Sequence, residues 1–195
     1  MFIETLTRNI KDSIRAKEKL LQEMLNEDIF SSAVEQIVKC YKNEGKLYIA
    51  GNGGSAADAQ HLAAEFVSKL ARDRAPLPAE ALTTDSSILT AIGNDYGFEN
   101  VFSRQILGKK HEKDIVLAIT TSGNSTNILN ALEQCKTLGI TSIVLTGRNG
   151  GRAKDKADHC LIVPGERTST IQELHIVLAH SMCECVEDKL FPRKI

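Results

Sequence analysis

The chain turns from strand to helix in the stretch Gly51-Asn52-Gly53-Gly54-Ser55-Ala56-Ala57-Asp58-Ala59-Gln60-His61-Leu62-Ala63-Ala64-Glu65, and this turn decides the predicted fold. The apolar residues 47–50 just before it predict a strand, and residues 55–72 predict a helix. Glycines allow the backbone to turn tightly and to approach a ligand closely. The first turn of a helix offers unpaired N–H groups and the positive end of its dipole to an anion.

Two titratable side chains follow on the same predicted helix. His61 and Glu65 are four residues apart and therefore share one face of that helix. A possible anion-binding turn and a titratable pair then belong to one strand–turn–helix unit. This arrangement predicts an active site.

The alternation of strand and helix continues along the chain. Segments 115–120 and 142–146 are almost continuously apolar, as strands buried on both faces of a parallel sheet are. The intervals between strands are long enough for helical crossovers. The predicted strands are residues 47–50, 79–83, 115–120, 142–146 and 160–163, and the predicted helices are residues 55–72, 86–93, 98–108, 125–138 and 170–188. The fold class is therefore α/β: a three-layer, doubly wound, flavodoxin-like domain with about five parallel strands, whose ligands bind beyond the carboxyl ends of the strands.

Residues 2–43 repeat apolar side chains at helical spacing and predict two helices, with a break at residues 26–28. Gly45 marks the end of the second helix, because glycine is the usual residue just past a helix C-terminus. We expect one domain over residues 1–195, with a helical arm at 1–44 and an α/β core at 45–195. The arm is expected to cap this domain; packing against another subunit is the alternative.

The composition is that of a soluble globular protein, with 42% hydrophobic and 25% charged residues. A net charge of −1 provides no general attraction to nucleic acid or to acidic membranes. The N-terminus lacks the pattern of a signal peptide, and no apolar segment approaches the ~20 residues of a membrane span. These features predict a cytoplasmic protein with neither a nucleic-acid nor a membrane partner. The five cysteines include no C-x-x-C pair and are expected to be small buried hydrophobes.

Four hydroxyl side chains gather at the end of the third predicted strand, in Thr120-Thr121-Ser122-Gly123-Asn124-Ser125. Capping of the next helix needs only one of them. Hydroxyls and helix N-terminal amides together can form a neutral-donor cradle for phosphate. The P-loop pattern G-x-x-x-x-G-K-[ST] does not occur in the sequence, so a single phosphate monoester is favoured over a nucleoside triphosphate.

The first glycine turn also satisfies the permissive dinucleotide fingerprint, since residues 51–56 have the spacing G-x-G-x-x-A. That fingerprint requires an acidic residue about 20 positions later, at the end of the next strand. The first acid after that strand is Asp85, 34 residues beyond Gly51. A nicotinamide enzyme is therefore disfavoured.

The segment Gly93-Asn94-Asp95-Tyr96-Gly97 is typical of a plain turn. Its Asn94 and Asp95 could instead offer amide and carboxylate groups to sugar hydroxyls. Spacing alone favours the plain turn.

The last predicted helix contains Gln172, His175 and His180. We expect His175 to be structural, because a lone histidine on a mostly apolar helix usually is; His111 and His159 are expected at the surface or in packing. Eight positions separate Gln172 from His180, which is roughly two turns or ~12 Å along the axis. If both are functional, they would serve different active sites, in subunits that share pockets across an interface.

The sequence contains six segments that belong together: Gly51-Asn52-Gly53-Gly54-Ser55 continuing through His61 and Glu65, Leu82-Thr83-Thr84-Asp85, Ala91-Ile92-Gly93-Asn94-Asp95-Tyr96-Gly97, Thr121-Ser122-Gly123-Asn124-Ser125, Leu145-Thr146-Gly147, and Ile171-Gln172-Glu173. With them the chain resembles the sugar isomerase (SIS) domain family and, within it, closely the phosphoheptose isomerases. The resemblance extends over nearly the whole length, including the two N-terminal helices.

The resemblance implies an aldose–ketose isomerase that converts sedoheptulose 7-phosphate to D-glycero-D-manno-heptose 7-phosphate through an enediol(ate), for lipopolysaccharide or other surface glycans. It places the catalytic acid/base pair at Glu65 and His180. Members that carry Zn²⁺, one per subunit, hold it with residues matching His61, Glu65, Gln172 and His180. The implied substrate contacts are Asn52, Gly53, Gly54, Ser55, Glu65, Asn94, Asp95, Thr120, Thr121, Ser122, Ser125 and Gln172. The family also implies a homotetramer with pockets at subunit boundaries.

Within this reaction Glu65 is the candidate base and His180 the complementary acid, because moving a proton between adjacent carbons requires both. A zinc ion would polarise the carbonyl and the developing oxyanion. The two roles compete in part, since a residue bound firmly to zinc is a weaker base.

Two positions depart from the common family pattern. Many relatives have arginine where this chain has Thr170 and Lys69. An isomerase of another phosphosugar is therefore one alternative. A non-catalytic SIS protein that senses a sugar phosphate or binds the replication initiator is another, and the Glu65–His180 pair argues against it.

Overall fold

A five-stranded sheet forms the centre of the computed structural model, which describes residues 2–24 and 28–192. Its strands are β1 (Leu47–Gly51), β2 (Ala79–Ala81), β3 (Ile115–Thr120), β4 (Thr141–Gly147) and β5 (His159–Val163). They lie in the order β2-β1-β3-β4-β5, and each neighbouring pair is parallel. This is the flavodoxin-like order, so the predicted fold class is confirmed. The order reverses between β1 and β3, which puts the switch point at the carboxyl ends of these two strands.

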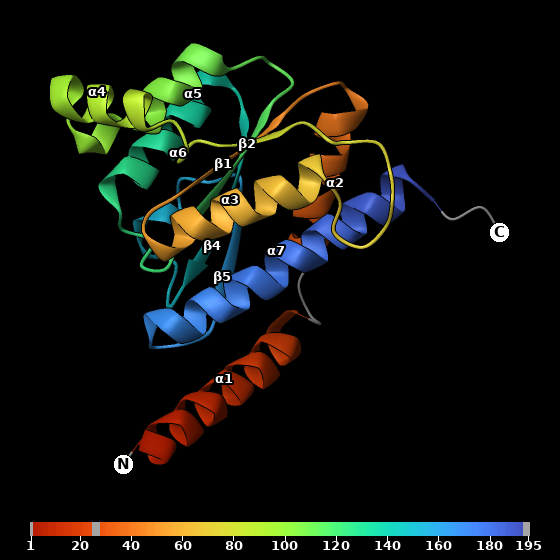
Figure 1. Cartoon of the computed structure of the whole chain (residues 1–195), viewed down its shortest axis with the longest axis vertical. Helices are drawn as coiled ribbons and strands as arrows, with labels where there is room; N and C mark the ends of the chain where they lie inside the picture. Colours follow the sequence, from red (N-terminus) through yellow and green to blue (C-terminus); the bar gives the residue numbers. More distant parts are fainter. Residues whose placement is uncertain (1, 25–27, 193–195) are drawn as a thin grey trace.

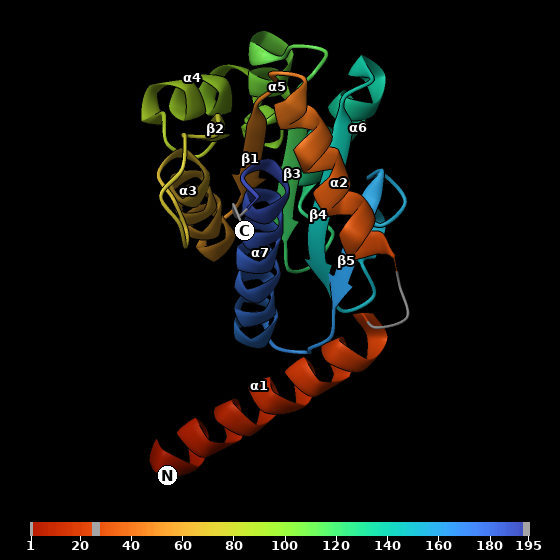
Figure 2. The same ribbon diagram turned by 90° about the vertical axis from the view of Figure 1, so that its right-hand side faces the viewer.

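Helices cover both faces of the sheet (Figures 1 and 2). The helices are α1 (Phe2–Met24), α2 (Ile29–Lys42), α3 (Gly54–Val67), α4 (Ser86–Tyr96), α5 (Ser103–Lys109), α6 (Thr126–Leu138) and α7 (Thr168–Leu190), with short 3-10 turns η1 (Phe98–Asn100) and η2 (Gly151–Ala153). Helices α2, α3 and α7 pack on one face, and α5 and α6 on the other. Figure 2 shows α1 projecting beyond the sheet at one end of the molecule. Among the described residues, no helix is long and apolar enough to cross a membrane.

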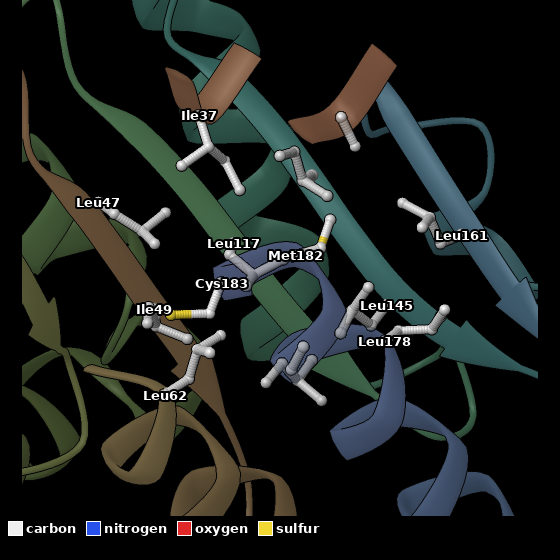
Figure 3. Close-up of a cluster of buried hydrophobic side chains, with 14 of the residues drawn as sticks. Ile37, Leu47, Ile49, Leu62, Leu117, Leu145, Leu161, Leu178, Met182 and Cys183 are labelled. Atoms are coloured by element: carbon white, nitrogen blue, oxygen red, sulfur yellow. The ribbon is translucent and has the colours of Figure 1, made fainter. Parts of the chain in front are cut away.

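The apolar strands have both faces buried because successive side chains point to opposite helical layers. In β1, Leu47 and Ile49 join the cluster with α2, α3 and α7, whereas Tyr48 joins the cluster with α5 and α6. Figure 3 shows the first cluster, in which Met182 of α7 lies among the aliphatic side chains of the sheet. This packing holds α3 and α7 side by side over the same sheet face.

Several element boundaries differ from the predicted ones. Helix α3 ends at Val67 rather than at residue 72, because the Arg74 guanidinium takes up the carbonyls of its last turn. The second strand stops at Ala81 rather than at residue 83. The helix expected at residues 98–108 is divided into η1 and α5.

Two turn predictions are also corrected. Residues 93–96 form the last turn of α4 and not a free turn, and the chain reverses only at Gly97, whose φ is 86°. At the end of α2 it is Glu44, with φ of 64°, that takes the left-handed conformation, and not Gly45. The predicted break between the N-terminal helices falls mostly on residues 25–27, which lie outside the described part of the chain, although α1 and α2 are two separate helices as expected.

Candidate active site

Two loops leave the sheet side by side at the switch point. Gly51 of β1 pairs with Ile119 of β3, so the glycine loop (residues 51–54) and the hydroxyl loop (residues 120–125) begin next to each other. Gly53 has φ of 55° and ψ of −120°, a conformation that requires glycine. The Ser55 amide donates to the Asn52 carbonyl over 3.0 Å, so the glycine loop already uses part of its hydrogen-bonding capacity internally.

The hydroxyl loop does not use its N-cap side chain, Ser125, to cap α6. Ser125 stands at the N-cap of α6, yet its hydroxyl makes no capping bond and lies 3.4 Å from the Thr120 hydroxyl. Gly123 has φ of 64°, and a Cβ there would lie 2.0 Å from the Gly150 carbonyl oxygen, so the loop is packed tightly against the segment after β4. This geometry supports the phosphate cradle over the capping alternative.

An asparagine pair ties the two loops together. The Asn52 amide donates to Asn127 Oδ1 and the Asn127 amide donates to Asn52 Oδ1, both over 2.8 Å. Asn127 lies in the first turn of α6 and is only 3% exposed. Sequence reasoning missed Asn127, because an asparagine near a helix start is typical of ordinary capping. The only available signal was its position directly after the hydroxyl loop.

The titratable residues of α3 and α7 meet in one cluster. His61 Nε2 lies 3.0 Å from Glu65 Oε1, and His180 Nε2 lies 3.4 Å from His61 Nε2. The two imidazole rings meet edge to face with centroids 5.0 Å apart. The His61 side chain is 46% exposed and that of Glu65 only 19%, so the cluster is reachable from solvent while the carboxylate is partly shielded. The predicted acid/base pair is thus brought together from the two ends of the α/β core.

The cluster also has the chemistry of a metal site. One donor atom from each of His61, Glu65 and His180 can be chosen so that all lie within 4.8 Å of one another. Two imidazole nitrogens and one carboxylate oxygen are a donor set of catalytic zinc sites, which leave a fourth position open. The residues present therefore fit zinc.

Gln172 lies away from the histidine cluster, although it belongs to α7 like His180. A Cβ placed on Gly54 would fall 2.1 Å from Gln172 Nε2, so this amide occupies the space that Gly54 leaves at the start of α3. From Gly54 to His61 is about two turns, or ~10 Å along α3, and the separation of Gln172 from His180 along α7 is similar. Within one chain the structure unites three of the four expected ligands and leaves Gln172 with the glycine loop.

Asn94 and Asp95 lie on the last turn of α4. Both are exposed, and the Asn94 amide donates to Asp95 Oδ1 over 2.7 Å. Helix α4 has no buried residue. These side chains therefore stand on an open surface of the chain.

Two titratable groups on α3 and α7, the partly buried Asp58 and the fully buried His175, have shifted pKa values. Burial raises the pKa of Asp58, one turn before His61 on α3, and the imidazole of His61 partly offsets this. Burial lowers the pKa of His175 to about 4, and the neighbouring Thr146 backbone acts in the opposite direction. His175 is fully buried in the core, as expected of a structural histidine.

The two positions that depart from the family pattern differ in environment. Thr170 is 6% exposed in the first turn of α7. The Lys69 ammonium is exposed beside Asp73, at 3.8 Å from its carboxylate. Thr170 therefore lies in packing, whereas Lys69 lies at the surface.

A separate cavity of about 830 Å³ opens at the amino-terminal edge of the sheet, opposite the loops. Its central carboxylate, Glu80, contacts both Lys46 and Lys109. Burial would raise the pKa of Glu80, but the hydrogen bonds and charges of these lysines lower it below its ordinary value. The ionic groups thus neutralise one another, and this cavity contains none of the predicted site residues.

Comparison with known proteins agrees with this geometry. A family model described as the SIS domain matches residues 7–147. The phosphoheptose isomerase of Aneurinibacillus thermoaerophilus is 51% identical over 186 residues, which is 95% of this chain and 91% of that protein. The phosphoheptose isomerase structure from Neisseria gonorrhoeae superposes with a TM-score of 0.89 at 42% identity, covering 96% of this chain and 100% of that one. The Francisella tularensis structure gives 0.90 at 35% identity, covering 96% and 99%. The family model covers the glycine loop, α3 and the hydroxyl loop, the two structures and the relative cover 95–96% of this chain, and the chain belongs to the SIS domain family, among the phosphoheptose isomerases.

Proposed function

We propose that this protein is an aldose–ketose isomerase that converts sedoheptulose 7-phosphate to D-glycero-D-manno-heptose 7-phosphate. The observation that carries the proposal is the meeting of Glu65 and His180 around His61, beside loops suited to a phosphate. A protein that only binds a sugar phosphate has no need of a shielded carboxylate next to an imidazole. Relatives named phosphoheptose isomerases support the same assignment.

The substrate is bound through two sets of groups. The hydroxyl loop, together with Ser55, takes the phosphate through hydroxyl donors and the start of α6. The sugar hydroxyls are met by amide, carboxylate and backbone groups of the glycine loop and α4. The phosphate contacts are Thr120, Thr121, Ser122, Ser125 and Ser55, and the sugar contacts are Asn52, Gly53, Gly54, Asn94, Asp95 and Gln172.

The reaction moves one proton between two carbons. Glu65 removes the proton from C1 of the ketose, and the C1–H electron pair becomes the C1=C2 double bond of the enediol(ate) while the C2 carbonyl electrons move to O2. Return of the proton to C2 and loss of the O1 proton give the aldehyde at C1. No oxidant or second substrate is required.

His180 handles the protons on the oxygens. Its imidazole donates to O2 as negative charge develops there and accepts the proton of O1 later in the reaction. His61, in contact with both Glu65 and His180, orients the two partners. Water is limited at Glu65, whose side chain is 19% exposed.

A Zn²⁺ ion, one per subunit, would be held by His61, Glu65 and His180, with Gln172 as a further ligand. When bound, it supplies a Lewis acid that polarises the carbonyl. The three convergent donors support this proposal. Metal analysis of purified protein, and the loss or survival of turnover after dialysis against a chelator, would test it.

A homotetramer with shared pockets fits the exposed surfaces. Helix α1 exposes Phe2 (88%), Ile3 (68%), Leu6 (53%), Ile10 (51%) and Ile14 (49%), an apolar stripe that a partner helix would cover. The separation of Gln172 from the histidine cluster also favours completion of each pocket by another subunit. We place the enzyme in the cytoplasm, where it supplies heptose for lipopolysaccharide or other surface glycans.

The deciding experiment is turnover in D₂O. An isomerase incorporates deuterium from solvent at the carbon that is reprotonated and forms the aldose, and NMR detects both. A sensor or partner-binding protein would give neither, and that outcome would overturn the proposal. A panel of other ketose phosphates, run alongside, tests whether Lys69 and Thr170 accompany a different sugar.

A further inference from the structure

A buried ion pair lies at the end of the helix that carries Glu65. Arg74 follows α3 in the chain, and Glu187 belongs to α7; both side chains are 1% exposed. Arg74 Nε donates to Glu187 Oε1 over 2.9 Å. The same carboxylate oxygen accepts the Leu70 amide over 3.2 Å. A buried pair of this kind costs desolvation and is weak evidence for stability by itself.

The rest of the Arg74 guanidinium binds the last turn of α3. Nη2 donates to the carbonyl of Glu65 over 2.8 Å, and Nη1 donates to that of Phe66 over 2.7 Å. Nη1 also lies 3.3 Å from the Ser68 carbonyl. Helix ends leave these carbonyls without partners inside the helix. Here the Arg74 side chain binds them, and the Leu77 amide also donates to the Phe66 carbonyl over 3.0 Å. The bond to Glu65 is made to the backbone of the same residue whose side chain faces the histidines.

Glu187 anchors this contact to α7. It stands seven residues after His180, about two turns along the same face of the helix. Cys183 stands between His180 and Glu187 on α7. Burial raises the pKa of its thiol to about 12, the carboxylates of Glu187 and Glu65 act in the same direction, and Arg74 acts against them. The ion pair and the catalytic carboxylate are therefore close neighbours.

We propose that Arg74 and Glu187 are positioning residues that fix Glu65 relative to His180. Glu65 lies in the last turn of α3, and such turns fray unless something holds them. Arg74 binds the Glu65 carbonyl and is itself held by α7, the helix that supplies His180. A misplacement of about 1 Å at a reacting group can cost 10²-fold in rate. The inference rests on the proposed isomerase function.

Kinetics of two single variants form the first test. Arg74→Lys keeps one charge but not the fork of donors, and Glu187→Gln keeps an acceptor but not the charge. We expect kcat to fall at least tenfold in each while KM changes less than threefold, because the hydroxyl loop that binds phosphate lies elsewhere. Wild-type kcat in both variants, measured well below their melting temperatures, would overturn the proposal.

A double variant separates positioning from stability. Arg74→Met with Glu187→Leu removes both buried charges, and such replacements commonly restore stability. Methionine cannot donate to the Glu65 carbonyl, so kcat is expected to stay low although Tm recovers relative to Arg74→Met alone. Recovery of kcat together with Tm would reduce the pair to a structural role. Leu132→Ala, in the core on the opposite face of the sheet, is the matched control that lowers Tm and leaves kcat unchanged.

Hydrogen exchange tests, without any turnover, whether Arg74 holds the last turn of α3; we call this contact of Arg74 with the Glu65 and Phe66 carbonyls the clamp. Amides of residues 66–70 should exchange at least tenfold faster in Arg74→Lys than in wild type, while amides of α6 keep their rates. Unchanged exchange at residues 66–70 would contradict the clamp even if the enzyme is active. The opposite result is also informative. If the wild type has no isomerase activity but residues 66–70 still exchange faster in Arg74→Lys, the proposed function is refuted and the contact of Arg74 with α3 stands.

Discussion

His180 Nε2 lies 3.4 Å from His61 Nε2, although 119 residues separate them in the chain. The contact exists because α3 and α7 pack side by side on one face of the sheet. In the proposed mechanism each helix contributes a separate part of the acid/base chemistry, with Glu65 on α3 and His180 on α7. The site is therefore a property of the helix pair and not of the glycine turn alone.

Removal of either partner should slow the chemical step. We expect Glu65→Gln and His180→Ala each to lower kcat by at least ~10², the scale of a general acid or base. The proposed tetramer should persist, because both side chains lie at the edge of the helix contact and not in the core. Turnover is followed by NMR and assembly by light scattering. The control is His111→Ala, because His111 is an exposed histidine away from the cluster. Near-normal turnover in a Glu65 or His180 variant would remove that residue from the mechanism.

Asn127 should act on substrate binding through Asn52. Asn127→Leu removes both 2.8 Å amide bonds and frees the Asn52 side chain to rotate. Two hydrogen bonds of about 1 kcal/mol each correspond to an increase in KM of roughly tenfold or more, with a smaller change in kcat. Asn130→Ala is the matched control, since Asn130 lies one turn later and its side-chain amide donates to the Glu99 carbonyl, away from Asn52. Equal KM values for the two variants would show that the amide pair does not position Asn52.

The sequence was sufficient to predict the centre of the sheet because its central strands are buried on both faces. β3 and β4 are continuous apolar runs for this reason, and they were located almost to the residue. The end of α3 could not be predicted, because it depends on Arg74. This residue lies in the loop after the helix and donates to the Glu65 and Phe66 carbonyls that precede it in the chain. Local propensity carries no information on such a contact.

Prediction of the site had a similar limit. His61 and Glu65 are visible as an i, i+4 pair, but the distance from His61 to His180 is set by the packing of two helices from opposite ends of the core. Asn127 was hidden because its residue type is ordinary at a helix start. The resemblance to a family supplied candidate residues, whereas the structure supplied the separation of Gln172 from the histidine cluster.

His175 should make the protein sensitive to acid. Its pKa is about 4 in the folded protein, below the ordinary value of 6.5, because burial disfavours the charged ring. Between these values the unfolded chain binds more protons, so stability falls as pH drops from 6.5 to 4 and loses about 3 kcal/mol in this window. Below pH 4 the group contributes no further change.

His175→Phe keeps a ring in the core and removes the titration. Urea unfolding of both proteins between pH 7 and pH 4 gives the difference in free energy of unfolding. The wild type should lose about 3 kcal/mol more than the variant over this range. Parallel curves for the two proteins would show that His175 is not responsible for the acid sensitivity.

Subunit mixing should reveal whether pockets are shared. Gln172 and His180 lie about two turns apart on α7 of one chain, so we expect a pocket that uses both to take them from different subunits. Gln172→Ala and His180→Ala proteins are each expected to be nearly inactive. After they are dissociated and reassembled together, about one quarter of the pockets should combine an intact Gln172 with an intact His180, if subunits associate at random in a closed symmetric oligomer.

Recovery of activity near that fraction would support shared pockets. A mixture as inactive as its components would instead place both residues in pockets built from a single chain. The control is a mixture of Glu65→Gln with His180→Ala. These two residues meet within one chain, so the two variants should not complement each other.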